Sequence, residues 1–146
     1  MTVLKKRKCK SNTPIVFAVP KALQDQIKRI PRLSLQSFKD NKAVTTDWYN
    51  ITFRIKIGLG IAESEYTNVT INPMVDVLEV CISILNRYRE LNIWAITRDE
   101  VELLENGLDA TDEMTDQTTR RVQLDAFHAS DKYMKRIVAN NNKLVI

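Results

Sequence analysis

The chain has 146 residues, 44% hydrophobic content and a formal net charge of +4. This size and composition fit one globular domain with a core that needs no metal or disulfide staple. Three glycines and four prolines argue against a turn-rich β-sandwich and for few, long elements. No apolar run approaches the ~20 residues that span a bilayer, and Cys9 and Cys81 lack metal-type spacing. We therefore expect a cytoplasmic protein with free thiols, no cofactor and no membrane association.

The charge is divided unevenly along the chain. Residues 1–42 hold 11 Lys/Arg and 2 acids, a net charge of +9, whereas residues 43–146 hold 11 Lys/Arg and 16 acids, a net charge of −5. Residues 1–14 form a basic arm that we expect to be disordered, because little in it can be buried. Its cations are Lys5, Lys6, Arg7, Lys8 and Lys10. Residues 15–146 are predicted to form a single helical domain.

The first part of that domain should hold one short helix. Residues 15–19 are an apolar run between two prolines and should be extended. A helix is predicted over residues 20–30, with Leu23, Ile27 and Ile30 as its apolar positions. Pro31 is expected to stop this helix, which leaves residues 32–46 as a connection with at most one helical turn.

The next two helices have clearer signals. Trp48, Ile51 and Ile55 begin a 3.6-residue repeat that runs to residue 62, and this repeat favours helix over the strand that the alternation in residues 51–57 would allow. Gly58 and Gly60 inside it indicate either close approach of another backbone or a break. Asn72 followed by Pro73 predicts the start of a third helix that runs to about residue 91. This helix is expected to be central and the most buried.

A capping box, Thr97 with Glu100 three residues later, predicts the start of a fourth helix. No strong stop signal follows until about residue 138, and an unbroken helix of about 40 residues would exceed the diameter of the domain. We therefore expect a kink or a break near Gly107 or within residues 115–119, or a projecting end. The fold prediction is an all-α bundle of about four helices, with a long C-terminal helix that could be kinked and an extended basic N-terminal arm.

Acidic residues recur along the fourth helix at steps of 3, 4, 3 and 4, which places them on one face. These residues, here called the acidic face, are Glu102, Glu105, Asp109, Asp112 and Asp116. The carboxylates repel one another, so neutralising them should leave stability unchanged or raise it. The face could be merely solvated, could dock a basic segment of the same chain such as Lys28 or Arg32, or could bind a basic partner protein.

Two other chemistries have weaker signals. Glu102 with Glu105, and Asp109 with Asp112, have the spacing of carboxylate pairs that hold Mg²⁺ in all-α nucleotide hydrolases, but such sites need a second acidic pair on another helix. The basic arm, with Arg120 and Arg121, could attract nucleic acid through phosphate contacts.

No catalytic motif accompanies these features. We therefore expect a non-catalytic interaction or accessory protein. In one version it is an inhibitor that binds a basic, nucleic-acid-handling protein through the acidic face. The first alternative is a nucleic-acid-associated factor that uses the basic arm and the C-terminal basic helix, and the second is a Mg-dependent all-α nucleotide hydrolase.

Overall fold

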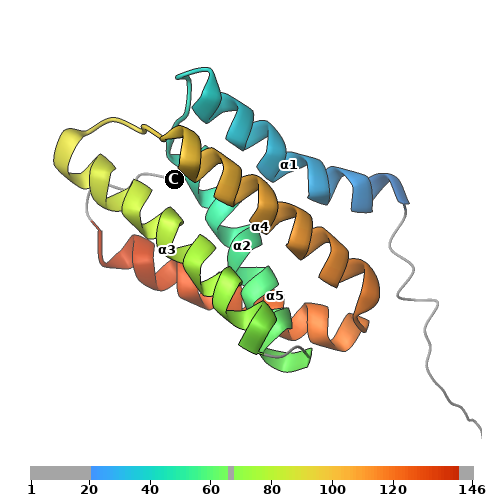
Figure 1. The fold of residues 1–146 in the computed structure, drawn as a ribbon. Helices are drawn as coiled ribbons and strands as arrows, with labels where there is room; N and C mark the ends of the chain where they lie inside the picture. The colour runs from blue at the N-terminus through green and yellow to red at the C-terminus, as the bar shows by residue number, and fades with distance from the viewer. Residues whose placement is uncertain (1–20, 66–67, 142–146) are drawn as a thin grey trace, which may run out of the picture.

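The structure, a computed structural model, describes residues 21–65 and 68–141 as five α-helices with no strand in those ranges (Figure 1). The helices are α1 (Lys21–Lys39), α2 (Thr45–Glu65), α3 (Asn68–Leu91), α4 (Arg98–Gln117) and α5 (Arg120–Ala139). The all-α prediction is therefore confirmed. The predictions for the basic arm (residues 1–14) and for the run at residues 15–19 lie outside the described residues.

The central element is α2, which packs against all four other helices. It has ten buried residues, whereas α3 has five among its described side chains, so the prediction that the third helix is the most buried is wrong. The physical reason is that apolar side chains surround most of the α2 circumference. Such a helix must be enclosed on nearly all sides to keep these side chains from water.

Two glycines let neighbouring helices approach α2 closely. A Cβ at Gly60 would lie 3.1 Å from the Cβ of Ala126 and 3.3 Å from its Cα, so α5 passes directly over this point. At Gly58 an added Cβ would meet Thr111 of α4. The prediction of close approach by another backbone is confirmed at Gly60, whereas the atoms nearest to Gly58 belong to side chains. Helix α2 continues without a break to Glu65.

The two prolines within the described residues, Pro31 and Pro73, lie inside helices rather than at their ends. Pro31 lies within α1, which continues to Lys39, so the prediction of a helix end at residue 30 and of a connection over residues 32–46 is wrong. Burial of Leu35 and Phe38 on the second half of α1 offsets the hydrogen bond that a proline removes. Pro73 likewise lies inside α3, which begins at Asn68 rather than at residue 73.

The C-terminal part of the chain consists of two helices rather than one long helix. The capping box is confirmed, because the Thr97 side chain accepts a hydrogen bond from the Glu100 N–H while Glu100 accepts one from the Thr97 N–H. Helix α4 passes through Gly107 and ends at Gln117, and Thr119 caps the start of α5. The threonine-rich patch is thus where the chain turns, and residues 21–65 and 68–141 form five helices where about four were predicted.

Gly58→Ala should lower the free energy of unfolding, although alanine favours helix over glycine by about 1 kcal/mol. The new Cβ would meet Thr111 Oγ1 and would lie 2.8 Å from Met74 Cε, and overpacking of this kind costs about 1–3 kcal/mol. Urea denaturation measures the change. In a Thr111→Ala background the loss should shrink, because the obstructing oxygen is gone. An equal loss in both backgrounds would contradict the close approach of α4.

Candidate functional site

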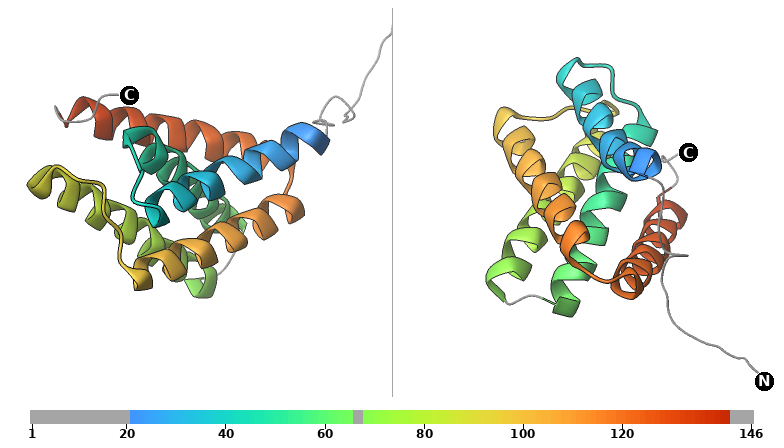
Figure 2. Two further views of the ribbon diagram at one scale, coloured as in Figure 1. Left: turned by 90° about the horizontal axis from the view of Figure 1, so that it is seen from above. Right: turned by 90° about the vertical axis from the view of Figure 1, so that its right-hand side faces the viewer.

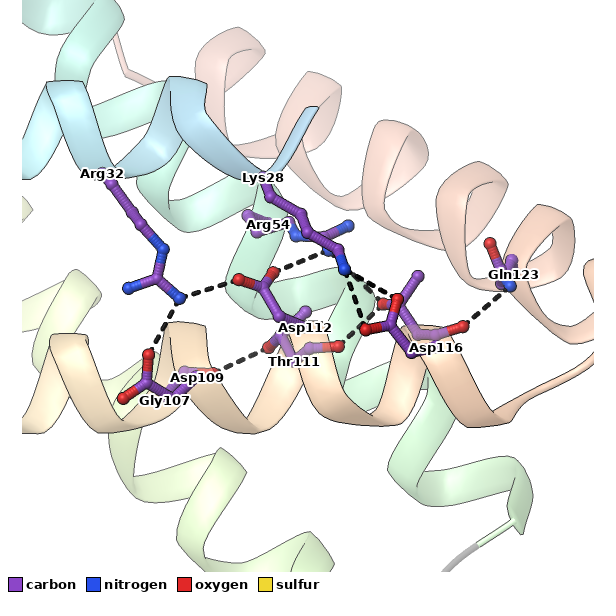
Figure 3. Close-up of polar contacts among 10 residues, drawn as sticks. Lys28, Arg32, Arg54, Gly107, Asp109, Thr111, Asp112, Asp116 and Gln123 are labelled. Atoms are coloured by element: carbon purple, nitrogen blue, oxygen red, sulfur yellow. Dashed lines mark hydrogen bonds and ion pairs between the residues drawn. The ribbon is translucent and has the colours of Figure 1, made fainter. Parts of the chain in front are cut away.

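The acidic face lies against α1 (Figure 3). Helix α1 runs antiparallel to α4, so its cations meet the acids in reverse order along the chain (Figure 1). Lys39 contacts Glu105 at 2.9 Å, Arg32 contacts Asp109 at 2.9 Å and Asp112 at 2.7 Å, and Lys28 contacts Asp116 at 2.7 Å. Of the three interpretations of this face, docking of the chain's own basic segment is the one that these contacts match.

A buried ion pair lies beneath this row. Arg54 of α2 donates from Nη2 to Asp112 at 2.9 Å, and the side chains of Arg54 and Asp112 are 7% and 18% exposed. The second oxygen of Asp112 accepts from Arg32. The hydrogen bond that Arg32 donates to Asp112 raises the pKa of Arg32, and burial only partly opposes that effect. Asp112 therefore joins three helices, because it neutralises one cation from α1 and another from α2.

The remaining candidate residues do not lie together at one site. Glu102 is exposed, and no described residue forms an ion pair with it. Arg121 at the start of α5 pairs with Asp125 one turn later at 3.4 Å, whereas Arg120 lies beside a groove described below. Lys5, Lys6, Arg7, Lys8 and Lys10 lie outside the described residues.

A groove of about 650 Å³ lies between α1 and α5, with α2 beneath it. Figure 2 shows these two helices flanking α2 on the side away from α3. The apolar part of the lining comes from all three helices and includes Ile27, Ile30, Phe53, Ile57, Leu124 and Phe127. The polar part lies mainly at the junction of α4 with α5 and includes Lys28, Arg54, Asp116, Thr118 and Arg120.

The apolar walls of this groove are open to water. Ile27 and Ile30 are 43% and 41% exposed, and Leu124 and Phe127 are 42% and 46% exposed. Contiguous exposed apolar surface in a folded domain marks a binding surface more often than a chance arrangement. The groove volume also lies within the range of ~300–1,000 Å³ that ligand sites occupy.

Sequence reasoning missed the groove because it treated the apolar row of α1 simply as a helix face to be buried. The structure buries the second half of α1 through Pro31, Leu35 and Phe38, and leaves Ile27 and Ile30 exposed. One signal was present in α5. Leu124 and Phe127 lie beside the buried face of α5 rather than on it. Apolar side chains outside the buried face of a helix indicate a second contact surface.

Three further observations bear on metal binding, on membrane association and on relationship to known proteins. Among residues 21–65 and 68–141 there is no group of three or more His, Cys, Asp or Glu side chains placed to hold a metal ion. None of the helices in these ranges combines the length and the apolar character needed to cross a bilayer. Comparison with protein-family models, with curated proteins and with solved structures finds no match.

Asp112→Asn should lower the free energy of unfolding by about 2–3 kcal/mol, because it leaves the Arg54 guanidinium buried without its anion. The expectation that neutralising the acidic face spares stability is therefore reversed at this position. Glu102→Gln is the matched control and should change stability by less than about 0.5 kcal/mol. Urea denaturation of both variants gives the comparison, and equal losses would show that the buried pair contributes little.

Proposed function

We propose that this is a non-catalytic interaction protein that binds a partner protein in the groove between α1 and α5. The observation that supports this proposal is the pair of exposed apolar rows, Ile27 with Ile30 and Leu124 with Phe127, on helices that flank a floor formed by α2. Two helices over an apolar floor form the kind of surface that recognises amphipathic segments of other proteins. An accessory or inhibitory role follows if the bound segment is one that the partner needs for its own activity.

The groove has better support as the partner surface than the acidic face does. Glu105, Asp109, Asp112 and Asp116 each contact a cation of the same chain. A basic partner would have to compete with these cations of α1 for the same carboxylates. Glu102 alone is too small a target for binding driven by charge, since exposed ion pairs contribute about 0–1 kcal/mol each.

The two alternatives have less support. For nucleic acid, the described cations Arg120 and Arg121 are at the start of α5, but Arg121 is engaged by Asp125 and Arg120 lies beside the apolar groove. A magnesium hydrolase would need Asp109 and Asp112 as ligands, and these carboxylates instead accept hydrogen bonds from Arg32. We therefore retain the interaction role as the proposal.

Site-specific photo-crosslinking in the native host tests the proposed surface. A benzophenone amino acid at position 127 keeps an aromatic side chain in the groove, and the same group at position 129 samples an exposed position of α5 outside the groove lining. We expect a defined protein adduct at position 127 and little or none at position 129, because only the groove would hold the partner against the probe.

Three outcomes would contradict this proposal. Equal labelling at both positions would show random contact, and absence of a protein adduct at either position would leave the groove without a partner. A nucleic-acid adduct at position 127 would instead favour the nucleic-acid-associated alternative. Thermal unfolding of both labelled chains checks that the probe has not disturbed the fold.

A further inference from the structure

The groove between α1 and α5 has apolar walls that the described residues leave uncovered. Ile27 and Ile30 on one wall, and Leu124 and Phe127 on the other, are between 41% and 46% exposed. Water in contact with contiguous apolar surface of this kind is unfavourable, and burying the surface lowers the free energy. The walls therefore favour an apolar occupant.

The polar end of the groove does not select a charged occupant. Lys28 pairs with Asp116, and Arg54 pairs with Asp112. Arg120, the remaining cation of the lining, also has an interaction in the structure. The cations of the lining thus already have partners, and the occupant that fits the groove is apolar and uncharged.

The chain itself contains a segment with this character. Residues 15–19 read Ile-Val-Phe-Ala-Val and lie between Pro14 and Pro20. The whole stretch of residues 11–20 carries no charged side chain. These residues come directly before Lys21, the first residue that the structure describes.

This segment joins the described chain at one end of the groove. Helix α1 begins at Lys21 and first contributes to the lining at Gln24, while α5 begins at Arg120, which is itself in the lining. Both helices begin on the same side of the molecule (Figure 2). Val19, the last residue of the apolar run, is therefore only five residues from the groove lining in the sequence.

The apolar run also has a suitable length. The lining extends along α1 from Gln24 to Pro31, a rise of about 10 Å at 1.5 Å per residue. Five extended residues cover about 16 Å, so the run can follow the whole lining after one reversal of direction. Pro20 stands where this reversal is needed, and proline favours turns because its φ is already fixed.

The short connection favours this segment over a separate molecule. A segment on a short linker is present at an effective concentration of about 1 mM. A second copy of the chain or another protein of equal affinity must reach a similar concentration before it occupies the groove to the same extent.

We infer that residues 15–19 occupy the groove between α1 and α5 when no partner is bound, and that a partner must displace them to bind. Phe17 and the aliphatic side chains around it cover the exposed walls, so the segment acts as an internal competitor. The displacement step rests on the proposed function and describes how its site is regulated, whereas occupation of the groove by the segment does not depend on that function.

Photo-crosslinking within the purified full-length chain tests the occupation. The benzophenone amino acid at position 127 should join tryptic peptide 122–132 to tryptic peptide 11–21 in a species of monomer mass, and mass spectrometry should locate the bond within residues 15–19. The same group at position 129 lies in the same tryptic peptide but outside the groove lining. It should give at least about tenfold less of this crosslink, because only position 127 is held against the segment.

Variants of the segment provide the second arm. Phe17→Glu should reduce the crosslink from position 127 at least about fivefold, because a carboxylate is unfavourable among apolar side chains. Phe17→Ser removes the apolar side chain without adding a charge and should change the yield in the same direction. Ser11→Glu adds the same charge outside the apolar run and should change the yield less than about twofold. Thermal unfolding of each variant checks that the helices remain intact.

Displacement is tested in the native host. Phe17→Glu should raise the yield of the partner adduct at position 127 at least about threefold, because the binding-competent open groove becomes more populated. Ser11→Glu should leave that yield unchanged. An equal yield with and without Phe17→Glu would show that the segment does not compete with the partner.

The outcomes separate the inference from the proposed function. A partner adduct without any crosslink to peptide 11–21 would refute the inference and leave the proposed function standing. A crosslink within the chain, with no partner adduct even in Phe17→Glu, would refute the proposed function and leave the segment as the occupant. A crosslink that is indifferent to Phe17→Glu would reflect random contact, and one found only in covalent dimers would make a second copy of the chain the occupant; either result overturns the inference.

Discussion

Enclosure of α2 is the constraint on which the remaining structure depends. Trp48, Ile51 and Ile55 share one side of α2 and Ile61 lies on another, and each of these side chains is at most 2% exposed. Removing such a helix from water requires neighbours on several sides, and the four other helices supply them. Gly58 and Gly60 allow two of these neighbours to approach closely. The enclosure is incomplete at one place, where Phe53 and Ile57 form the floor between α1 and α5, and this gap is the groove.

A second constraint is the charge on α4. A row of carboxylates on one face would repel along the whole helix, and the structure relieves this repulsion with cations from α1 and with Arg54 from α2. The outer pairs are exposed and each contributes little. The Arg54–Asp112 pair differs, because loss of either partner leaves a charge that is largely shielded from water. The part of the uneven charge that lies on α1 and α4 is thus an internal complementarity between these two helices.

Local patterns predicted the helices better than their ends or their partners. The capping box at Thr97 and the 3.6-residue repeat of α2 were sufficient to predict helices α4 and α2, because both signals depend on neighbours a few residues away. Pro31 and Pro73 led to wrong predictions of helix ends. The hydrogen bond that a proline removes is a local loss, whereas the burial that offsets this loss comes from distant helices. The sequence could suggest that Lys28 and Arg32 meet the acidic face. It could not show that the apolar row of α1 stays open, since exposure depends on where α5 lies.

Helix α1 is held by two kinds of contact that respond differently to the surrounding solution. Its second half is fixed by the buried side chains Leu35 and Phe38, and its first half meets α4 through the ion pair of Lys28 with Asp116. Dissolved ions screen exposed pairs over about 8 Å at physiological ionic strength, whereas apolar burial does not weaken in this way. The first half of α1 is also one wall of the groove. Higher ionic strength therefore weakens one of the contacts that hold this wall against α4, whereas the apolar packing of the floor formed by α2 does not depend on salt in this way.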